Sequence, residues 1–342
     1  MGKREGFEGL SGLLDEIKLC CEEVDRCIFE ILESDKDIQV LYQSSIHLFK
    51  AGGKRVRPFL AIKACEAVGG DPGISIPVAS AIEILHTFTL IHDDIMDESD
   101  LRRGVPTVHT VGGIPQAITS GDYLFAKVFQ AICRSEVAER IGYGKIVRIA
   151  GMIAEAMIDI AKGQTLDLLL QSRIDVSEEE YLEMIRLKTA RLFQVSAEIG
   201  ALIGGCSYEE FEALSSYGLK AGLAFQIVDD ILGLVGSEEE LGKPVGSDLR
   251  EGKKTIIVIH GLRKLPTRSK SIVTRVLGRR DASNEDVKKA VEALVRYGCI
   301  EYAKNMALKF RDEAISSLSK IKPSRSRASL EELACLFVDR RL

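Results

Sequence analysis

The sequence predicts an all-α fold, and three observations support this prediction. Apolar residues recur at spacings of three and four along most of the chain, as in KLCCEEVDRCIFEILES, which is the period of an amphipathic helix. A serine followed three residues later by Asp or Glu marks helix starts at Ser177, Ser207, Ser283 and Ser329. Alternating strand patterns are scarce. The one candidate, KTIIVIHGL at 254–262, is interpreted as a buried helix because its neighbours are helical.

Short turn signals, rather than linkers, separate the predicted helices. The stretch 69–72, GGDP, ends one helix and begins the next, and the glycines at 204 and 205 end the long run that Ser177 opens. No Pro- or Ser-rich segment divides the chain, and no repeat of fixed period occurs. We therefore expect residues 1–342 to form a single domain.

The composition excludes several classes of protein. With 46% apolar residues, 28% charged residues and a net charge of −5, the chain does not resemble a nucleic-acid binder that relies on bulk charge. The eight cysteines include no CxxC pair, so reduced thiols in a cytoplasmic protein are the simplest interpretation. The N-terminus lacks a signal-peptide core, and no charge-free run reaches the roughly 18 apolar residues that a membrane span needs.

An unusual group of acids follows an apolar run in LHTFTLIHDDIMDESDLRRG, residues 85–104. On a helix, Asp93 and Asp97 lie four residues apart on one face, with Asp94 beside them. Like charges at this spacing destabilise a helix by about 0.2–0.5 kcal/mol per pair. A solvated acidic patch would account for the charges but not for the apolar residues that precede them. A site where carboxylates bind Mg²⁺ together with substrate phosphate accounts for both.

A second acidic pair echoes the first. FTLIHDDIMD at 88–97 resembles AFQIVDDILG at 224–233, where Asp229 and Asp230 end an apolar run and Gly233 replaces the third carboxylate. This motif is weak alone. Two such helices together could hold several Mg²⁺ ions, whose charge a diphosphate would balance.

Four basic clusters suit such an anion. GGKRVRP at 52–58 supplies Lys54, Arg55 and Arg57, whose guanidinium groups suit bidentate phosphate contacts. The other clusters are Arg102 with Arg103, Lys188 with Thr189, and the Gly-rich segment with Lys243 and Lys253. Each has an ordinary alternative: a helix start, salt bridges from the arginines to Asp97, Glu98 or Asp100, a solvated lysine, or simple turns. Together with the acids and apolar helices, they suggest that the substrate is a diphosphate with a hydrocarbon tail.

In their order and approximate spacing, these motifs resemble those of the trans-isoprenyl diphosphate synthases. The resemblance runs from GGKRVRP through LHTFTLIHDDIMDESDLRRG, the KT pair and FQIVDDILG to GKPVGSDLREGKKT, which covers nearly the whole chain. It is closest to the archaeal-type geranylgeranyl diphosphate synthases. The resemblance implies a single large bundle of long helices around a deep central cavity, usually in a homodimer, two or three Mg²⁺ ions, and isopentenyl and allylic diphosphates as substrates.

The resemblance also implies a role for individual residues. Asp93 and Asp97 would bind Mg²⁺ with Asp94 in support, and Asp229, with Asp230, would hold a further ion. The residues implied for the isopentenyl diphosphate are Lys54, Arg57, His86 and Arg103. Those implied for the allylic diphosphate are Arg102, Lys188, Lys243 and Lys253. Thr189 and Gln226 would lie near the reacting carbons. The C-terminal Arg340 and Arg341 would stand in for the basic tail of other members.

Product length is expected to depend on the helix that carries the first acidic motif. Phe88 precedes Asp93 by five residues, about 7–8 Å along a helix, with Leu85 and Thr89 close by. The resemblance implies that an aromatic residue at this position stops growth at C20, and products of C15 or C25 remain alternatives. In the implied mechanism the departing diphosphate takes up the proton, so no Ser, Cys or His nucleophile is required; the sequence contains no GxSxG motif.

Three other functions are weighed against this one. A terpene cyclase also uses a DDxxD motif and Mg²⁺, but it binds no second diphosphate, so the basic clusters argue against it. A non-catalytic partner subunit is disfavoured by the intact acidic and basic sets. A helical interaction protein with surface acids does not explain why acids, bases and apolar runs recur in order.

Overall fold

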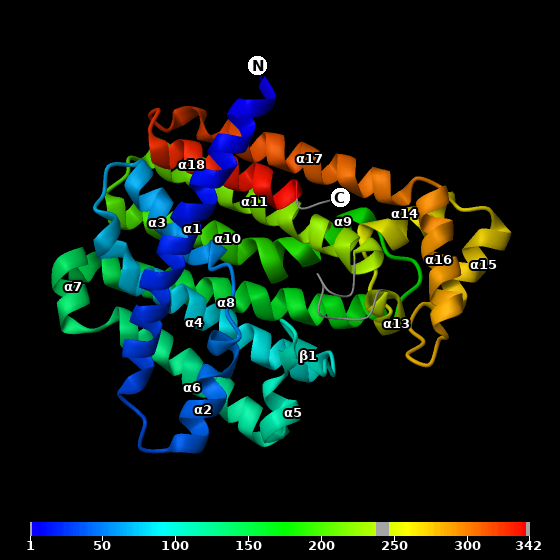
Figure 1. Ribbon diagram of the computed structural model, residues 1–342, viewed down its shortest axis with the longest axis horizontal. Helices are drawn as coiled ribbons and strands as arrows, with labels where there is room; N and C mark the ends of the chain where they lie inside the picture. The colour runs from blue at the N-terminus through cyan, green and yellow to red at the C-terminus, as the bar shows by residue number, and fades with distance from the viewer. Residues whose placement is uncertain (1, 237–245, 340–342) are drawn as a thin grey trace. The chain divides into compact units, whose positions relative to one another are not determined.

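A computed structural model of the chain describes residues 2–236 and 246–339, with side chains from residue 12 onward (Figure 1). The described chain is almost entirely helical. Its one sheet in these ranges is a two-stranded antiparallel ladder of β1 (Leu101–Arg102) and β2 (Val105–Pro106). The predicted all-α fold is confirmed.

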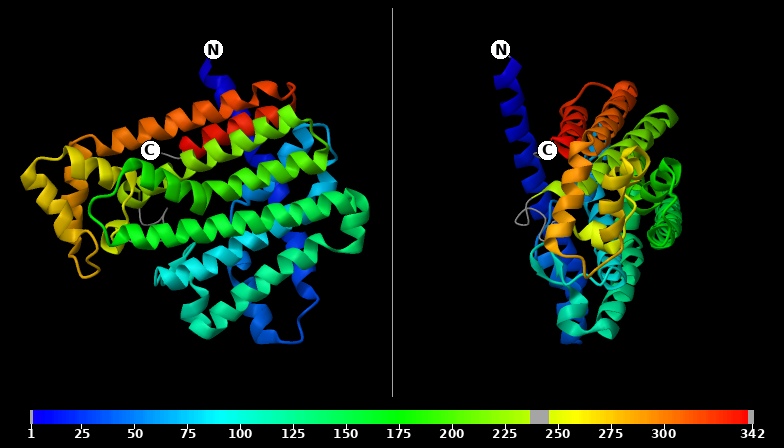
Figure 2. Two further views of the ribbon diagram at one scale, coloured as in Figure 1. Left: turned by 180° about the vertical axis from the view of Figure 1, so that it is seen from behind. Right: turned by 90° about the vertical axis from the view of Figure 1, so that its right-hand side faces the viewer.

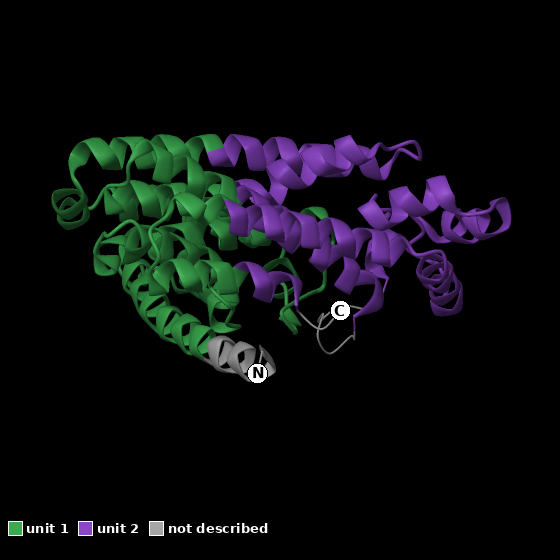
Figure 3. Cartoon of the chain, turned by 90° about the horizontal axis from the view of Figure 1, so that it is seen from above, with its two compact units in different colours: residues 1–155, 193–218, 317–333 green, residues 156–192, 219–316, 334–342 purple. Residues whose placement is uncertain are grey.

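The chain divides into two compact units, which are coloured separately in Figure 3. Unit 1 comprises residues 1–155, 193–218 and 317–333, and unit 2 comprises residues 156–192, 219–316 and 334–342. Several helices contribute residues to both units. The expected single domain stays a prediction, and each unit is described by itself below.

Unit 1 is built around α4 (Pro72–Met96), which packs against α1, α3 and α6. In Figure 2, α4 and α6 run alongside each other in cyan and teal. Asp71 caps α4 by accepting a hydrogen bond from the Gly73 N–H at 2.9 Å, so the predicted helix start at 69–72 is confirmed. The helices that lie wholly in this unit or begin in it are α1 (Gly2–Glu33), α2 (Gln39–Lys50), α3 (Val56–Ala67), α4, α5 (Val108–Gly112), α6 (Ile114–Ile132), α7 (Ser135–Ile141), α8 (Tyr143–Gln171), α11 (Tyr208–Val235), the 3₁₀ turn Leu318–Lys320 and α18 (Arg325–Val338).

Helix α4 is also the one helix within the described ranges that is long and apolar enough to cross a membrane. Of the 18-residue window that meets this criterion, 61% is buried inside the protein. A buried apolar helix of this length is typical of a protein core.

Unit 2 contains most of the C-terminal half. Its helices are α9 (Glu178–Ile185), the start of α10 (Arg191–Gly204), most of α11 (Tyr208–Val235), α13 (Ser247–Glu251), α14 (Ile256–Lys264), α15 (Thr267–Val276), α16 (Asn284–Arg296) and α17 (Cys299–Ser317). The stretch 254–262 contributes to the buried helix α14, as predicted, with Ile256 and Ile257 fully buried.

Three of the four predicted helix starts are confirmed. Ser177 and Ser207 each form a reciprocal capping box with the glutamate three residues later, and Ser283 caps α16. The prediction at Ser329 was wrong, because α18 begins at Arg325. Ser324 lies just before it and accepts from the Arg327 N–H, whereas the buried Ser329 hydroxyl donates to Glu16.

The long run predicted between Ser177 and Gly205 is interrupted by a π-helical turn, Arg186–Ala190. This turn carries the KT pair. A single π-helical turn inside an α-helix frequently marks a functional position.

Candidate active site

The first acidic motif closes α4. Asp93 lies in the last turn, Asp97 is the C-cap, and the chain then turns through Glu98, whose φ is +53°. Only 1% of Asp94 and 8% of Asp97 is exposed. Anionic groups at a helix C-terminus oppose the helix dipole, at about 0.3–1 kcal/mol each. Buried carboxylates in this position therefore depend on nearby cations for their stability.

One such cation is Arg102. Its Nε donates to Asp94 Oδ1 at 2.8 Å, and its Nη2 donates to the same oxygen. The structure thus gives Arg102 an ion pair with Asp94, which was not among the acids expected as its partners from the sequence. Arg102 belongs to a hairpin whose two-residue turn, Arg103–Gly104, has positive φ at both positions. That is the geometry of a type I′ turn, and it places both arginines directly after the acids in the chain.

The two glycines of GGKRVRP permit a crowded loop. A Cβ at Gly53, where φ is +158°, would lie 2.7 Å from Nη1 of both Arg55 and Arg103. Arg103 Nη1 also donates to the Gly52 carbonyl. Glycine is needed here because any side chain would displace one of the two guanidinium groups.

The three cations of this loop have different environments. Arg55 is 2% exposed and is held by Asp25 at 2.7 Å and Glu83 at 3.1 Å, so its guanidinium group serves the fold. Lys54 is exposed. Arg57 Nη1 lies 3.1 Å from His86 Nε2, and its guanidinium carbon lies 4.4 Å from the centre of the Phe193 ring.

His86 is neutral in this cluster. Loss of hydration lowers its pKa well below the usual value, and the charges of Arg57, Arg103 and other arginines lower it further. Because arginine only donates hydrogen bonds, Nε2 must accept from Arg57 and Nδ1 must carry the proton. The predicted residues Arg57 and His86 are therefore in contact.

Sequence reasoning missed Glu83, a buried carboxylate of α4 that lies three residues before His86. Burial raises its pKa, while the charges of Arg55, Arg103 and Arg57 oppose that rise. Its position among three arginines explains how so many cations pack together. A lone acid inside the apolar stretch SAIEILHTF was the available signal.

Phe88 faces α6. Its ring centre lies 5.2 Å from that of Phe125 and 4.8 Å from that of His92. Leu85 is fully buried, and the Thr89 hydroxyl donates to the His86 carbonyl at 2.7 Å. The three predicted chain-length residues therefore have different surroundings.

In unit 2, the π-helical turn lies against α8. Lys188 Nζ donates to Asp167 Oδ2 at 2.6 Å, and only 5% of Asp167 is exposed. A Cβ at Gly163 would lie 2.3 Å from the backbone nitrogen of Lys188, so only glycine allows this approach. Sequence reasoning missed both residues, although GQTLD places an acid next to apolar positions.

A chain of hydrogen bonds joins Thr189, of the KT pair, to the second acidic motif. Thr189 donates to Gln226 Oε1 at 2.7 Å, and Gln226 Nε2 donates to Asp230 Oδ1 at 2.8 Å. Tyr181, which sequence reasoning also missed, donates to Asp230 Oδ2 at 2.6 Å. Burial raises the pKa of Asp230 to about 7, and the charges of Asp248 and Asp229 contribute to the rise, whereas the Tyr181 and Gln226 hydrogen bonds oppose it.

The third position of the second motif has a carboxylate close by. A Cβ at Gly233 would lie 2.6 Å from Asp248 Oδ2. Asp248 belongs to α13, in the segment GSDLREGKK. Farther along, Lys253 Nζ lies 2.8 Å from Glu251 Oε2. Lys243, Arg340 and Arg341 lie outside the described residues.

The predicted site residues thus form two groups. Unit 1 brings together Arg57 with His86 and Arg102 with Asp94, next to Asp93 and Asp97. Unit 2 brings together Thr189, Gln226 and Asp230, with Asp229 beside them, and pairs Lys188 with Asp167.

The donor atoms fit Mg²⁺, which prefers carboxylate oxygens and retains water or phosphate ligands. Within the described residues, no three His, Cys, Asp or Glu side chains are arranged to hold a metal ion by themselves. An ion at either acidic motif would therefore take further ligands from water or substrate, as Mg²⁺ does at phosphate sites.

Comparison with known proteins agrees with these features. The polyprenyl synthetase family model matches residues 38–294. A geranylgeranyl diphosphate synthase from Saccharolobus solfataricus is 43% identical, with coverage of 89% of this chain and 92% of that protein. A geranylfarnesyl diphosphate synthase from Aeropyrum pernix is 39% identical, with coverage of 87% and 92%.

Solved structures agree as well. The crystal structure of geranylgeranyl pyrophosphate synthetase from Pyrococcus horikoshii is 42% identical with a TM-score of 0.89, and the match covers 97% of this chain and 99% of that one. A polyprenyl synthase from Caulobacter crescentus, complexed with calcium and isoprenyl diphosphate, is 34% identical with a TM-score of 0.89 and coverage of 97% and 98%. The chain belongs to the polyprenyl synthetase family.

Proposed function

We propose that the protein is a Mg²⁺-dependent prenyltransferase that condenses isopentenyl diphosphate head-to-tail with allylic diphosphates of C5 to C15, giving geranylgeranyl diphosphate. The observation that carries this proposal is the crowding of buried carboxylates and arginines at the end of an apolar helix, because a diphosphate with bound Mg²⁺ can interact with both sets of charges. Two or three Mg²⁺ ions per site would supply electrostatic stabilisation of the departing diphosphate.

The residues divide by substrate. Lys54, Arg57, His86 and Arg103 bind the diphosphate of isopentenyl diphosphate. Arg102, Lys188, Lys243 and Lys253 bind the allylic diphosphate. Asp93 and Asp97, supported by Asp94, would hold Mg²⁺, and Asp229 with Asp230 would hold a further ion.

The reaction follows from these roles. The allylic C–O bond breaks, and its electron pair leaves with the diphosphate. The alkene of isopentenyl diphosphate forms the new C–C bond with the allylic cation, and a proton from the adjacent carbon passes to the released diphosphate. Apolar side chains exclude water, which would otherwise quench the cation. Thr189 and Gln226, held by their mutual hydrogen bond, lie near the reacting carbons.

Phe88 sets the product length in this proposal. Its ring rests on Phe125, so it cannot swing aside without displacing a second aromatic ring. A tail growing along α4 would stop there at C20. Farnesyl and C25 diphosphate synthases are the alternatives within the family.

A homodimer is supported by an exposed face of α8. Positions 147, 151, 154, 158, 161, 165 and 168 are all exposed and carry Val, Gly, Ala, Ile, Ala, Thr and Leu. Their alternating spacing of four and three is that of a helix–helix interface. Together with a cytoplasmic location and a single catalytic domain, this assembly completes the proposal. Ile158→Glu is expected to convert dimer to monomer in sedimentation analysis.

Diphosphate release tests the function. A synthase releases diphosphate from an allylic primer rapidly only when isopentenyl diphosphate is also present and Mg²⁺ has not been removed by EDTA. Rapid release from C20 diphosphate alone would indicate a cyclase instead. No release under either condition would indicate a non-catalytic subunit.

A further inference from the structure

The segment 263–280 of unit 2 carries a concentration of positive charge that no step of the proposed reaction uses. It contains seven lysines and arginines and no aspartate or glutamate, in a chain whose net charge is −5. The seven are Arg263, Lys264, Arg268, Lys270, Arg275, Arg279 and Arg280. We call this segment the basic segment.

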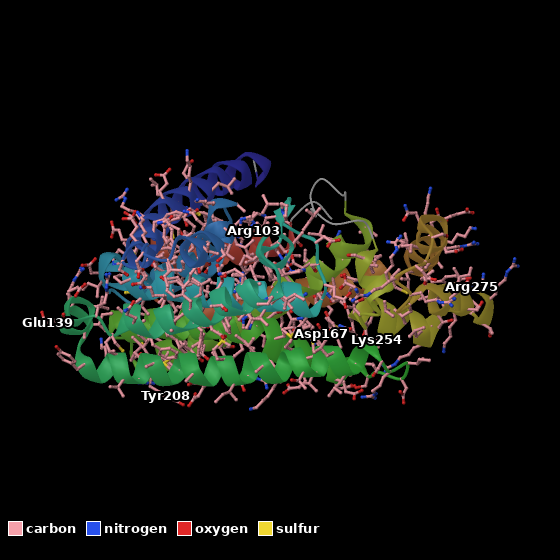
Figure 4. The ribbon with its side chains drawn as sticks, turned by 90° about the horizontal axis from the view of Figure 1, so that it is seen from below. Arg103, Glu139, Asp167, Tyr208, Lys254 and Arg275 are labelled. Carbon is pink, nitrogen blue, oxygen red and sulfur yellow. The ribbon has the colours of Figure 1, made fainter. Side chains whose placement is uncertain are left out.

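The cations face solvent because α15, the helix at the centre of the basic segment, packs its apolar side into the protein. Val273 and Val276 are buried, and every exposed position of α15 is a lysine, an arginine or a hydroxyl residue. Arg275, labelled in Figure 4, extends away from the ribbon.

Most of this charge is not neutralised within the protein. Arg263 Nη1 lies 3.5 Å from Glu178 Oε1, and the Arg263 side chain is 51% exposed. Among the described residues, Arg268, Lys270 and Arg275 form no ion pair. Like charges gathered at an exposed surface raise the local positive potential, which favours an anionic partner.

The basic segment ends against the turn that carries Lys253. The Gly278 N–H donates to the Leu249 carbonyl at 2.8 Å. A Cβ at Gly252, where φ is +81°, would lie 3.1 Å from the Gly278 Cα. The basic segment and a proposed diphosphate-binding lysine therefore share one packed turn.

We propose that the basic segment docks the protein onto an anionic phospholipid membrane surface. Clusters of four to eight lysines and arginines attract anionic headgroups, and the basic segment carries seven, three of them on α15. The segment has no aromatic residue, so it lacks the stacking surfaces with which proteins hold single-stranded nucleic acids. It also exposes no large apolar residue on α15, so docking is electrostatic and without insertion.

The consequence of docking rests on the proposed function. A C20 diphosphate has a long apolar tail, so a membrane next to the Lys253 turn gives the product a surface to enter. Docking itself needs neither substrate nor Mg²⁺. It can therefore be tested apart from catalysis.

Vesicle sedimentation of the full-length protein tests docking. The protein is expected to sediment with vesicles of equal parts phosphatidylglycerol and phosphatidylcholine at about 50 mM salt, and to be released at about 500 mM salt, where charges are screened within about 4 Å. It should remain in solution with phosphatidylcholine alone. R268Q/K270Q/R275Q should weaken partitioning about a hundredfold, because each cation near the surface contributes about fivefold.

A matched variant, K18Q/R140Q/K322Q, removes three exposed cations from unit 1 and should sediment like the natural protein. The docking proposal is overturned by no sedimentation with anionic vesicles, by an equal loss in both variants, or by a preference for single-stranded RNA over vesicles in competition. Both variants should keep full elongation activity in vesicle-free solution. If the natural protein is active but does not sediment with anionic vesicles, this inference alone is overturned; if it sediments but is inactive, the proposed function alone is overturned.

Discussion

Lys188 of the π-helical turn is bound to Asp167 of α8, with 2.6 Å between Nζ and Oδ2, and Gly163 lies against the backbone of the same lysine. The next residue, Thr189, bonds instead to Gln226 of α11. Two adjacent side chains are thus held by two different helices. The site in unit 2 depends on this turn.

Asp167→Asn should reduce kcat/KM for the allylic substrate more than it reduces the stability of the fold. The amide keeps the shape of the carboxylate but loses the charged hydrogen bond that orients Lys188, which is worth about 1.5–3 kcal/mol, or about 10- to 150-fold in kcat/KM. Steady-state kinetics with varied allylic primer measures this. Glu183→Gln is the control, because it breaks an exposed pair with Arg186 that contributes about 0–1 kcal/mol. Unchanged kcat/KM in Asp167→Asn would remove its positioning role.

Gly163→Ala should destabilise the protein. The new Cβ would lie 2.3 Å from the Lys188 backbone nitrogen, and overpacking of this kind costs about 1–3 kcal/mol or more. Gly144→Ala, on the same helix but outside the proposed dimer face, meets nothing within 4 Å and should stabilise by about 0.4–1 kcal/mol. Urea denaturation of the two variants should show opposite signs. The same sign in both would contradict the close packing of α8 on the π-helical turn.

Restoring an acid at the third position of the second motif should create a conflict. In Gly233→Asp, measured in EDTA, a new carboxylate would stand next to that of Asp248 and reduce stability by like-charge repulsion. Gly233→Asn should reduce stability less. Asp248→Asn should recover part of the loss in the Gly233→Asp background, with a coupling energy of about 0.5–3 kcal/mol. Strictly additive effects would show that the two positions do not interact.

Asp230 should make the metal-free protein less stable as pH rises. Its pKa is raised from 3.8 to about 7 by burial, with added effects of Asp248 and Asp229, so the folded protein holds a proton there that the unfolded chain has lost. Stability from this group is present below about pH 4, falls between about pH 4 and pH 7, and then stays level.

Urea midpoints in EDTA across this range check that prediction. Asp230→Asn should flatten the pH dependence, and Tyr181→Phe should extend the fall above pH 7 by removing a hydrogen bond that stabilises the carboxylate. Asp175→Asn, at a highly exposed carboxylate, is the control. An Asp230→Asn profile parallel to that of the natural protein would contradict the assignment.

Phe88→Ala should lengthen the product. Removal of the ring opens space in front of Phe125, so elongation should continue beyond C20. Product sizing by chromatography measures this. Phe129→Ala, which removes a ring that touches Phe125 but is not among the rings in contact with Phe88, is the comparison and should keep the C20 product. An unchanged product length in Phe88→Ala would show that Phe88 is not the residue that stops chain growth.

Local sequence patterns predicted much of the fold. The helical period, the Ser177 capping box and the buried helix at 254–262 depend on residues close together in the chain. The predicted helix start at Ser329 was wrong because the same signature also occurs inside a helix. Here the capping residue, Ser324, lies more than one turn earlier. The π-helical turn was not predicted from the local pattern, and it packs closely against Gly163 of α8, which is distant in the sequence.

The site shows the same division. Acids and cations were found where motifs concentrate them, as in Asp93 and Arg102. Their partners Glu83, Asp167 and Tyr181 were missed because each lies alone among apolar neighbours in the sequence, and its role depends on a contact between distant segments. Such residues become visible only when hydrogen-bond partners of buried charges are traced.

The most direct test of the central claim is to size the products of the purified protein. It would be incubated with Mg²⁺, labelled isopentenyl diphosphate and, separately, C5, C10 and C15 allylic diphosphates, and the hydrolysed alcohols would be separated by chromatography. We expect a C20 alcohol from each primer and none after EDTA. No elongation from any primer would contradict the proposed function.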